Sequence, residues 1–212
     1  MSSSDKKSAI DKPSRIQTRN RKKILEAALY IFSRYGYRGS TVAQIAERAE
    51  MSKANLLYYY SSKSDIYVEV LENTLSAWLA PLTDLQPDGD PIEQIWAYTR
   101  TKLNLSKESP EASRLFANEI LQGAPMINEF LHEDLKQLVD DKCRVIQHWA
   151  DDGKIAPIKP LSLLFLIWAA TQHYADFSTQ TEILSDTPDT LYADAEVTLK
   201  TIIMNGLQPS PH

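Results

Sequence analysis

Residues 41–60 read TVAQIAERAEMSKANLLYYY, and this stretch holds two short helical patterns separated by a turn. Thr41 and Ser52 precede the two patterns, and both are residue types that cap the N-terminus of a helix. The side chain of Ala46 is small enough for two helices to cross closely. Apolar side chains recur at helical spacing in both patterns, at Val42, Ile45, Ala46, Leu56, Leu57 and Tyr60. The stretch therefore predicts a helix-turn-helix, whose second helix presents its outer face to the major groove of DNA.

Helical patterns continue on both sides of this motif. We expect a helix over 18–35 that Gly36 ends, and a long helix over 63–82 that Ser62 caps. Alternating β-branched runs bounded by turn residues, which would indicate strands, are missing from the chain. Further helical patterns occupy residues 92–107, 111–122, 126–152, 161–179 and 190–205. The sequence thus predicts an all-α protein of about nine helices.

The helices divide into two expected domains. A three-helix DNA-binding domain spans 15–63, and a ligand-binding and dimerisation domain spans 64–207, while 1–14 and 208–212 are expected to be disordered tails. The last helix carries an apolar stripe that a monomer is expected to leave exposed, made of Leu191, Ala195, Leu199 and Ile202 or Ile203. We therefore expect a homodimer that forms through the last two long helices.

Charge is distributed unevenly along the chain. Residues 1–63 contain 13 Lys and Arg against 5 Asp and Glu, a balance of +8, whereas the remainder has a balance of −13. The alternative interpretation is a charged tail alone, because Lys6, Lys7 and Lys12 carry part of the excess. The other basic residues of this region lie in patterned sequence, however. A basic head on an acidic body is typical of a protein that binds nucleic acid at one end.

Other features of the sequence narrow the class of protein. Cys143 is the single cysteine among 212 residues, so it has no partner for an internal disulfide, and we expect a reducing, cytoplasmic location. The longest apolar run, 161–170, is well short of the roughly 20 residues of a membrane span. No histidine pair, cysteine cluster or phosphate-binding glycine loop is found, so we expect no metal, no cofactor and no enzyme activity.

The motif and its flanks resemble the DNA-binding region of TetR-family regulators over residues 19–67. The matching pieces are FSRYGY at 32–37, GST at 39–41, IA at 45–46, MSK at 51–53, LLYYY at 56–60 and SK at 62–63. Two positions depart from the family pattern, since Glu50 stands where a turn glycine is common and Ser64 where an acidic residue is common. The first departure predicts a side chain at a position that often has a positive φ.

The resemblance implies a set of DNA contacts. Thr41, Ser52, Tyr59 and Lys63 are expected to contact phosphates, and Lys53, Ala54 and Asn55 to lie near bases. Leu57 stands where many relatives have tyrosine, which predicts an apolar contact, such as one with a thymine methyl group. Tyr58 is expected on the same face, with packing as the alternative. Lys63 has the alternative of capping only its own helix region, and Tyr60 is expected in the core.

The resemblance extends into the second domain. The segments WLAPL at 78–82, ASRLF at 112–116, LQGAP at 121–125 and IWAATQHYADF at 167–177 look like those of the uracil-responsive regulators of pyrimidine utilisation within this family. This likeness implies a repressor that binds double-stranded DNA at a near-palindromic operator. It also implies uracil or thymine as the small-molecule effector that releases the DNA.

The residues themselves are compatible with a pyrimidine site. A flat pyrimidine requires an apolar slot for ring stacking, with groups that donate and accept hydrogen bonds. Trp168 and Gln172 are i,i+4 neighbours, and the amide of Gln172 supplies both kinds of group. Trp78 is expected to close the slot. Further candidates are Phe116, Glu119, Gln122, His173, Tyr174 and Phe177, with core packing as the alternative for the aromatic residues.

A rival hypothesis keeps the DNA-binding head and changes the partner of the second domain. In that hypothesis the protein is an adaptor, whose C-terminal helices bind a protein partner or a different small ligand. A polar-lined pocket inside the second domain would argue against the adaptor, whereas a solid core would favour it. A helical enzyme would require a convergent acid–base or metal cluster, which the sequence does not show.

Overall fold

The computed structural model describes residues 15–209, and helices are the only regular secondary structure within this range. The predicted all-α class is confirmed. In chain order the helices are α1 (Arg15–Gly39), α2 (Val42–Arg48), α3 (Lys53–Tyr59), α4 (Lys63–Thr83), α5 (Pro91–Glu108), α6 (Pro110–Leu121), α7 (Asn128–Phe130), α8 (Lys136–Asp151), α9 (Pro160–Asp176), α10 (Ser178–Leu184) and α11 (Leu191–Leu207). The nine predicted helices correspond to all of these except the short α7 and α10. The tail expected at 1–14 lies outside the described residues. The same holds for residues 210–212 of the tail expected at 208–212.

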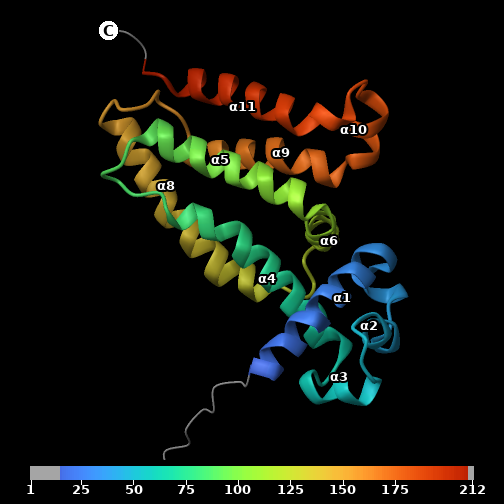
Figure 1. The fold of residues 1–212 in the computed structure, drawn as a ribbon. Coiled ribbons are helices and arrows are strands. Elements are labelled where there is room, and N and C mark those ends of the chain that lie inside the picture. The colour runs from blue at the N-terminus through green and yellow to red at the C-terminus, as the bar shows by residue number, and fades with distance from the viewer. Residues whose placement is uncertain (1–14, 210–212) are drawn as a thin grey trace, which may run out of the picture.

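Helices α1 to α3 form a compact head at one end of the molecule (Figure 1). Its core contains Ile24 and Phe32 of α1, Ile45 of α2 and Leu56 of α3, all of them almost fully buried. Gly36 has a φ of 68° and a ψ of 171°, which interrupts the helical backbone before the last residues of α1. Glycine adopts this conformation without the steric penalty of a Cβ atom, so the predicted break at Gly36 is confirmed.

Three side-chain caps set the starting points of the helices that follow. Thr41 accepts a hydrogen bond from the backbone N–H of Gln44, and the Gln44 side chain accepts one from the N–H of Thr41. Ser52 caps α3 and Ser62 caps α4 in the same way, each through its hydroxyl oxygen. These caps satisfy backbone donors that a helix N-terminus otherwise leaves unpaired. All three caps were predicted from the sequence.

The body is built around α5. Helix α9 packs on one side of α5 and α11 on another, while α4 and α8 complete the bundle. Its core contains Trp149 of α8, Ile95 of α5 and Leu164 of α9. Helix α4 starts in the head and runs into the body, so one helix joins the two parts of the molecule (Figure 1).

Two predicted helices are less regular than the sequence pattern indicates. The segment predicted as one helix over 126–152 contains α7, then a turn of π-helix at Leu131–Leu135, and then α8. The helix predicted to end at 179 ends at Asp176, because Phe177 has a non-helical backbone (φ −113°, ψ 35°) and α10 follows it. Apolar periodicity continues through both irregularities, which is why it did not reveal them.

The predicted dimerisation stripe on the last helix was wrong in its orientation. Ala195 and Ile203 are buried, and Leu191 and Leu199 are half-buried, because this side of α11 packs within the monomer against α5. Ile202, which the prediction gave as the alternative to Ile203, is 63% exposed, and so is Val197, at 68%, which the prediction did not include. On α9, the exposed apolar side chains are Leu161, Phe165 and Leu166. An apolar face is therefore present on both helices, but it is not the predicted stripe.

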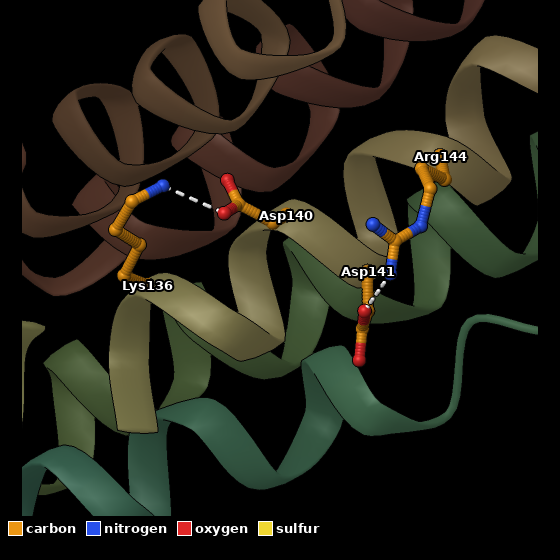
Figure 2. A network of polar contacts seen from close by, with 4 residues as sticks. All are labelled: Lys136, Asp140, Asp141 and Arg144. Atoms are coloured by element: carbon orange, nitrogen blue, oxygen red, sulfur yellow. Dashed lines mark hydrogen bonds and ion pairs between the residues drawn. The ribbon is translucent and has the colours of Figure 1, made fainter. Parts of the chain in front are cut away.

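The outer face of α8 carries ion pairs between neighbouring turns. Figure 2 shows Lys136 with Asp140, whose charged atoms are 2.6 Å apart, and Arg144 with Asp141. Each pair is solvent-exposed and contributes about 0.5 kcal/mol or less to stability. The acidic pair at 140–141 is thus part of a solvated helix surface.

Glu50, in the turn between α2 and α3, has a φ of 55°. We expect Glu50→Gly to raise the free energy of unfolding by about 0.5–1 kcal/mol, because glycine removes the steric cost of this conformation while adding some entropy to the unfolded chain. Urea unfolding measures the change. The control Glu47→Gly, within helix α2, is expected to lower stability by about 1 kcal/mol. Destabilisation by Glu50→Gly would contradict the inferred strain.

Candidate functional site

The outer face of α3 is formed by the residues that the sequence singled out. Lys53, Ala54, Asn55, Leu57 and Tyr58 are exposed, and Tyr58 is 73% exposed, so it does not pack in the core. On the opposite side of the helix, Leu56 is fully buried. Thr41 and Ser52 are also exposed at the starts of α2 and α3. The head therefore presents short polar, methyl-bearing and cationic groups on one helix face, as a major-groove reader requires.

The tyrosines that end α3 have different surroundings. The hydroxyl oxygen of Tyr59 accepts a hydrogen bond from the side-chain amide of Asn20, 2.8 Å away, which ties α3 to α1. Tyr60 is buried as expected, and the guanidinium of Arg21 lies 5.0 Å from the centre of its ring. Burial raises the pKa of the Tyr60 hydroxyl well above its usual value. Tyr60 is thus a core residue, whereas Tyr59 is half-buried and lies at the edge of the exposed face.

Lys63 is directed towards the loop between α1 and α2. Its ammonium group donates hydrogen bonds to the backbone carbonyl oxygens of Tyr37 and Ser40, at 2.6 and 2.8 Å. The same nitrogen lies 4.3 Å from the centre of the Tyr37 ring. The alternative raised from the sequence, in which Lys63 caps its own helix region, is not what the structure shows, because the carbonyls that it binds belong to the end of α1 and the loop after it.

A cavity of about 50 Å³ lies in the body between α4, α5, α6, α9 and the π-helical turn. Four of the predicted ligand residues meet there, namely Trp78, Phe116, Trp168 and Gln172. The other lining residues are Leu75, Leu79, Tyr98, Lys102 and Leu135. The cavity is mostly apolar and aromatic, with Lys102 and Gln172 as its strongly polar side chains.

Five predicted ligand residues do not line this cavity. Glu119 is buried, and its carboxylate accepts hydrogen bonds from the Tyr67 hydroxyl and the Met126 backbone N–H, so it links α4 and α6 to the chain after α6. Gln122 is exposed, and its amide donates to a backbone carbonyl of α6. The three aromatic residues near the end of α9 lie elsewhere, with His173 stacked on Phe177 and Tyr174 beside Tyr192. A rotation of 100° per residue turns positions 173, 174 and 177 away from the face of 168 and 172.

Tyr98 and Lys102 line the cavity and were missed in the sequence. They are i,i+4 neighbours on α5, and the Tyr98 hydroxyl oxygen accepts a hydrogen bond of 2.6 Å from the indole N–H of Trp168. Burial raises the pKa of Tyr98 to about 12. The sequence pattern could have indicated Lys102, because it lies on the same helix face as the buried Ile95 and Leu103. Lysine is rarely buried without a partner or a function.

Lys102 is the most unusual residue of the cavity. Its side chain is 3% exposed, and its ammonium nitrogen lies 4.0 Å from the centre of the Trp78 ring. Burial lowers the pKa of Lys102 to about 7, against the opposing effect of the Asp176 carboxylate. Within residues 15–209 no hydrogen bond or ion pair satisfies this ammonium. The residue is buried, but its nitrogen keeps some access to solvent, since among residues 15–209 the fully buried side-chain polar atom without a partner is the Tyr60 hydroxyl oxygen. A cation with so little access and no protein acceptor is still unfavourable, so the cavity suits a molecule that brings an acceptor oxygen to Lys102.

Asp176 is the last residue of α9, and its carboxylate opposes the lowering of the Lys102 pKa. Its carboxylate accepts a hydrogen bond from the Ser113 hydroxyl of α6, and burial raises its pKa, although Ser113, Lys102 and Arg114 oppose the change. The Arg114 guanidinium donates to the Ala175 backbone carbonyl. These contacts fix the end of α9 against α6 beside the cavity.

Comparison with known proteins identifies the architecture. Residues 24–70 match the family described as bacterial regulatory proteins, tetR family, and residues 71–210 match the YcdC-like protein C-terminal region. The chain belongs to the TetR family. It is therefore a helix-turn-helix transcriptional regulator, and such regulators bind operator DNA and a small-molecule effector, usually as dimers.

Individual relatives support the same assignment. The HTH-type transcriptional regulator RutR of Escherichia coli K12 is 45% identical over 201 residues, which cover 93% of this chain and 95% of RutR. A tetR-family regulatory protein from Rhodococcus RHA1 has a TM-score of 0.72 at 16% identity, covering 94% of this chain and all of that one. The ketosteroid transcriptional regulator KstR2 of Mycobacterium tuberculosis has a TM-score of 0.69 at 19% identity, with coverage of 90% and 95%. The two structures share the TetR-family fold with this chain. Among residues 15–209, no helix combines the length and apolar character that crossing a membrane requires.

The buried ammonium leads to a prediction for stability. We expect Lys102→Met to raise the free energy of unfolding by about 2 kcal/mol at pH 7, because it removes an unpaired buried cation and keeps the packing volume. The folded-state pKa lies below that of a free lysine, so the unfolded wild type binds more protons between about pH 7 and pH 10. The wild type therefore gains stability across this window, and the advantage of the variant shrinks.

Urea unfolding at several pH values checks this prediction. Lys107→Met, at an exposed position of the same helix, is the matched control and is expected to be nearly neutral at every pH. Destabilisation by Lys102→Met, with Lys107→Met neutral, would show that the Lys102 ammonium is well satisfied in the folded protein.

Proposed function

We propose that the protein is a repressor of pyrimidine utilisation, released from a near-palindromic operator by uracil or thymine. The observation that carries the proposal is the cavity where Trp78, Trp168, Gln172 and Lys102 converge. In this role the chain is a cytoplasmic binding protein without catalytic activity. It draws on the sequence resemblance to uracil-responsive regulators, and on the 45% identity with RutR over nearly the whole chain.

The chemistry of the cavity matches a pyrimidine dione. Such a ring has two apolar faces for stacking against indole, and its edge alternates carbonyl oxygens with N–H groups. The amide of Gln172 supplies a donor and an acceptor for one carbonyl and the neighbouring N–H, and the ammonium of Lys102 supplies a donor for a carbonyl. An effector carbonyl would thus satisfy the cation that the free protein leaves without an acceptor.

The cavity also suits a ligand that changes the conformation of the protein. A volume of about 50 Å³ holds only a few water molecules, so a pyrimidine ring requires the walls to move apart. Trp78 is a wall residue of α4, and α4 begins at Lys63, four residues after the end of α3. Binding then favours a form in which the two recognition helices of a dimer no longer fit successive major grooves.

The DNA-binding role is assigned to residues 15–63 and the effector and dimer roles to 64–207. We assign phosphate contacts to Thr41, Ser52 and Tyr59, which lie exposed or half-buried around the recognition helix. We assign positions against the bases to the exposed face of α3, formed by Lys53, Ala54, Asn55, Leu57 and Tyr58. Two such heads related by twofold symmetry require two half-sites in inverted orientation.

The dimer is assigned to the exposed apolar side chains of α9 and α11. These helices form the end of the body that lies away from the head (Figure 1). Phe165 and Leu166 of α9 and Val197 and Ile202 of α11 are all more than half exposed, and burial of such a surface stabilises association. The adaptor hypothesis is less well supported, because a solid core would not contain a cavity lined by a buried lysine.

The proposed function leads to a prediction for effector binding. Uracil or thymine at about one hundred times its Kd should raise the melting temperature by about 5–10 °C, because it binds the folded state only. The same compound should release the protein from a duplex selected out of a random-sequence library by the free protein. Gel-shift titration measures the release, with a purine as the control compound.

The affinity for the effector should also depend on pH. An effector carbonyl at Lys102 raises the pKa of that group above its free value of about 7, so the bound protein holds the proton more tightly. Affinity is then full below pH 7, and it falls by up to about tenfold per unit as the pH rises above 7. A melting temperature unaffected by both pyrimidines at millimolar concentration would refute the pyrimidine assignment and leave the DNA-binding role intact.

A further prediction concerns the dimer. Val197→Glu with Ile202→Glu should yield monomers in sedimentation velocity, because the two carboxylates would lose hydration at the interface. The matched control, Gln137→Glu with Gln147→Glu, adds the same charge to the exposed face of α8 and should leave the sedimentation coefficient unchanged. Monomers in the wild type, or a dimer that survives the double substitution, would contradict the assigned face.

A further inference from the structure

Trp78 lies between the cavity and a second, more open space. A groove of about 230 Å³ lies between α1, α4 and the adjoining ends of α5 and α6, and we call it the Trp78 groove. Among residues 15–209, Trp78 is the one residue that lines both this groove and the cavity. We propose that the effector enters the cavity from the Trp78 groove, and that the Trp78 indole makes room for it by moving into the groove. This inference rests on the proposed effector role of the cavity.

Two helices run past the Trp78 indole from one space to the other. On α5, Lys102 lines the cavity, and Leu105 lines the groove one turn further along. On α6, Ala112 lines the groove, and Phe116 lines the cavity one turn further along. The Trp78 ring contacts the cavity side of both helices, because its centre lies 4.0 Å from the Lys102 ammonium nitrogen and 5.9 Å from the centre of the Phe116 ring. The indole is therefore the side chain that closes the cavity towards the groove.

Trp78 is held less firmly than Trp149 and Trp168, two other tryptophans of the body. The indole N–H of Trp149 donates to the Pro87 backbone carbonyl at 2.9 Å, and that of Trp168 donates to the Tyr98 hydroxyl oxygen at 2.6 Å. Within residues 15–209, the indole N–H of Trp78 has no protein acceptor. Movement of Trp78 therefore breaks packing contacts but no hydrogen bond, which lowers the cost of displacing it.

The groove has the space that the cavity lacks. A cavity of about 50 Å³ is too small for a pyrimidine ring, since a protein cavity that binds benzene has a volume on the order of 150 Å³. The groove is larger than that, and it is open to solvent, because Glu26, Asn73 and Ala77 of its lining are exposed. An indole that moves into the groove enlarges the cavity, so the entry of a ring needs no prior separation of the helices. The displaced indole stays beside the ring, in keeping with its stacking role.

A second opening beside the cavity is less suitable for entry. A hollow of about 100 Å³ lies between the end of α4 and α5, and Tyr98 lines both this hollow, which we call the Tyr98 hollow, and the cavity. Entry there would displace Tyr98, which is 2% exposed and accepts the hydrogen bond from Trp168. Breaking a hydrogen bond between buried groups has a cost that movement of Trp78 avoids. The larger volume of the Trp78 groove and the freer side chain beside it favour the groove as the entrance.

Filling the groove tests this proposal. Ala77 is an exposed residue of α4 that lines the groove next to Trp78, so Ala77→Phe occupies space into which the indole would move. Ala97 is an exposed residue of α5 that lines the Tyr98 hollow, so Ala97→Phe is the matched control. Stopped-flow tryptophan fluorescence measures the association and dissociation rate constants of uracil for the full-length wild type and for both variants.

We expect Ala77→Phe to lower the association rate constant of uracil by about tenfold or more, because a filled groove opposes the movement of Trp78. Ala97→Phe should leave this rate constant within about twofold of the wild type, as expected for a surface substitution away from the entrance. A double-mutant cycle with Trp78→Leu then tests whether Ala77→Phe acts through the indole. Trp78→Leu itself weakens binding through the loss of stacking, but Ala77→Phe should slow association much less in that background, since leucine needs little room in the groove.

An unchanged association rate constant in Ala77→Phe, or equal slowing by Ala97→Phe, would overturn the proposal. Equal slowing by Ala77→Phe in both backgrounds would also overturn it, because it would indicate a general disturbance of the fold. Circular dichroism and thermal unfolding establish that each variant is folded, and Ala77→Leu takes the place of Ala77→Phe if the latter does not fold. If the wild type binds neither uracil nor thymine, the proposed effector itself is refuted, so the two failures are distinguishable.

Discussion

Helix α4 runs from the DNA-binding head into the body and couples the two parts of the molecule. Its 21 residues form one helix, about 30 Å long at 1.5 Å per residue, with Pro81 in its last turn. The Ser62 cap fixes where it begins, directly after the recognition helix, and Trp78 on the same helix forms a wall of the body cavity. Because a helix of this length moves largely as a unit, a change at the cavity and a change at the head are mechanically connected.

Stability and the proposed binding of an effector make opposing demands at the cavity. Apolar helices packed around α5 would be most stable with an apolar residue at position 102. The chain instead has an ammonium there, against the face of Trp78. Binding sites commonly retain such locally unfavourable groups, because a ligand that satisfies them gains affinity from the interaction. The cost of burying Lys102 is therefore evidence for a ligand with an acceptor.

The sequence was informative where structure is determined locally. The caps at Thr41, Ser52 and Ser62, and the exposed face of α3, follow from residue types and spacing within a few turns. The sequence was less informative where distant segments meet. Lys102 lies on a patterned helix, but its burial depends on α4, α6 and α9 together. The apolar stripe of α11 has the same sequence pattern whether it packs on α5 or on a second chain. The sequence alone therefore could not show which side of α11 faces the interior of the monomer.

The contrast between Lys63 and Lys102 shows how the same side chain serves two purposes in this fold. At Lys63, the end of α1 supplies two carbonyl oxygens, and the cation is satisfied within the chain and fixes a loop. At Lys102, the surrounding helices supply an aromatic face, and within residues 15–209 none of the acceptors that line the cavity forms a hydrogen bond with the ammonium. Both lysines lie against an aromatic ring, so the ring alone does not distinguish them. The decisive difference is the presence or absence of a hydrogen bond to the ammonium, which separates the lysine that fixes a loop of the DNA-binding head from the lysine that we propose contacts the effector.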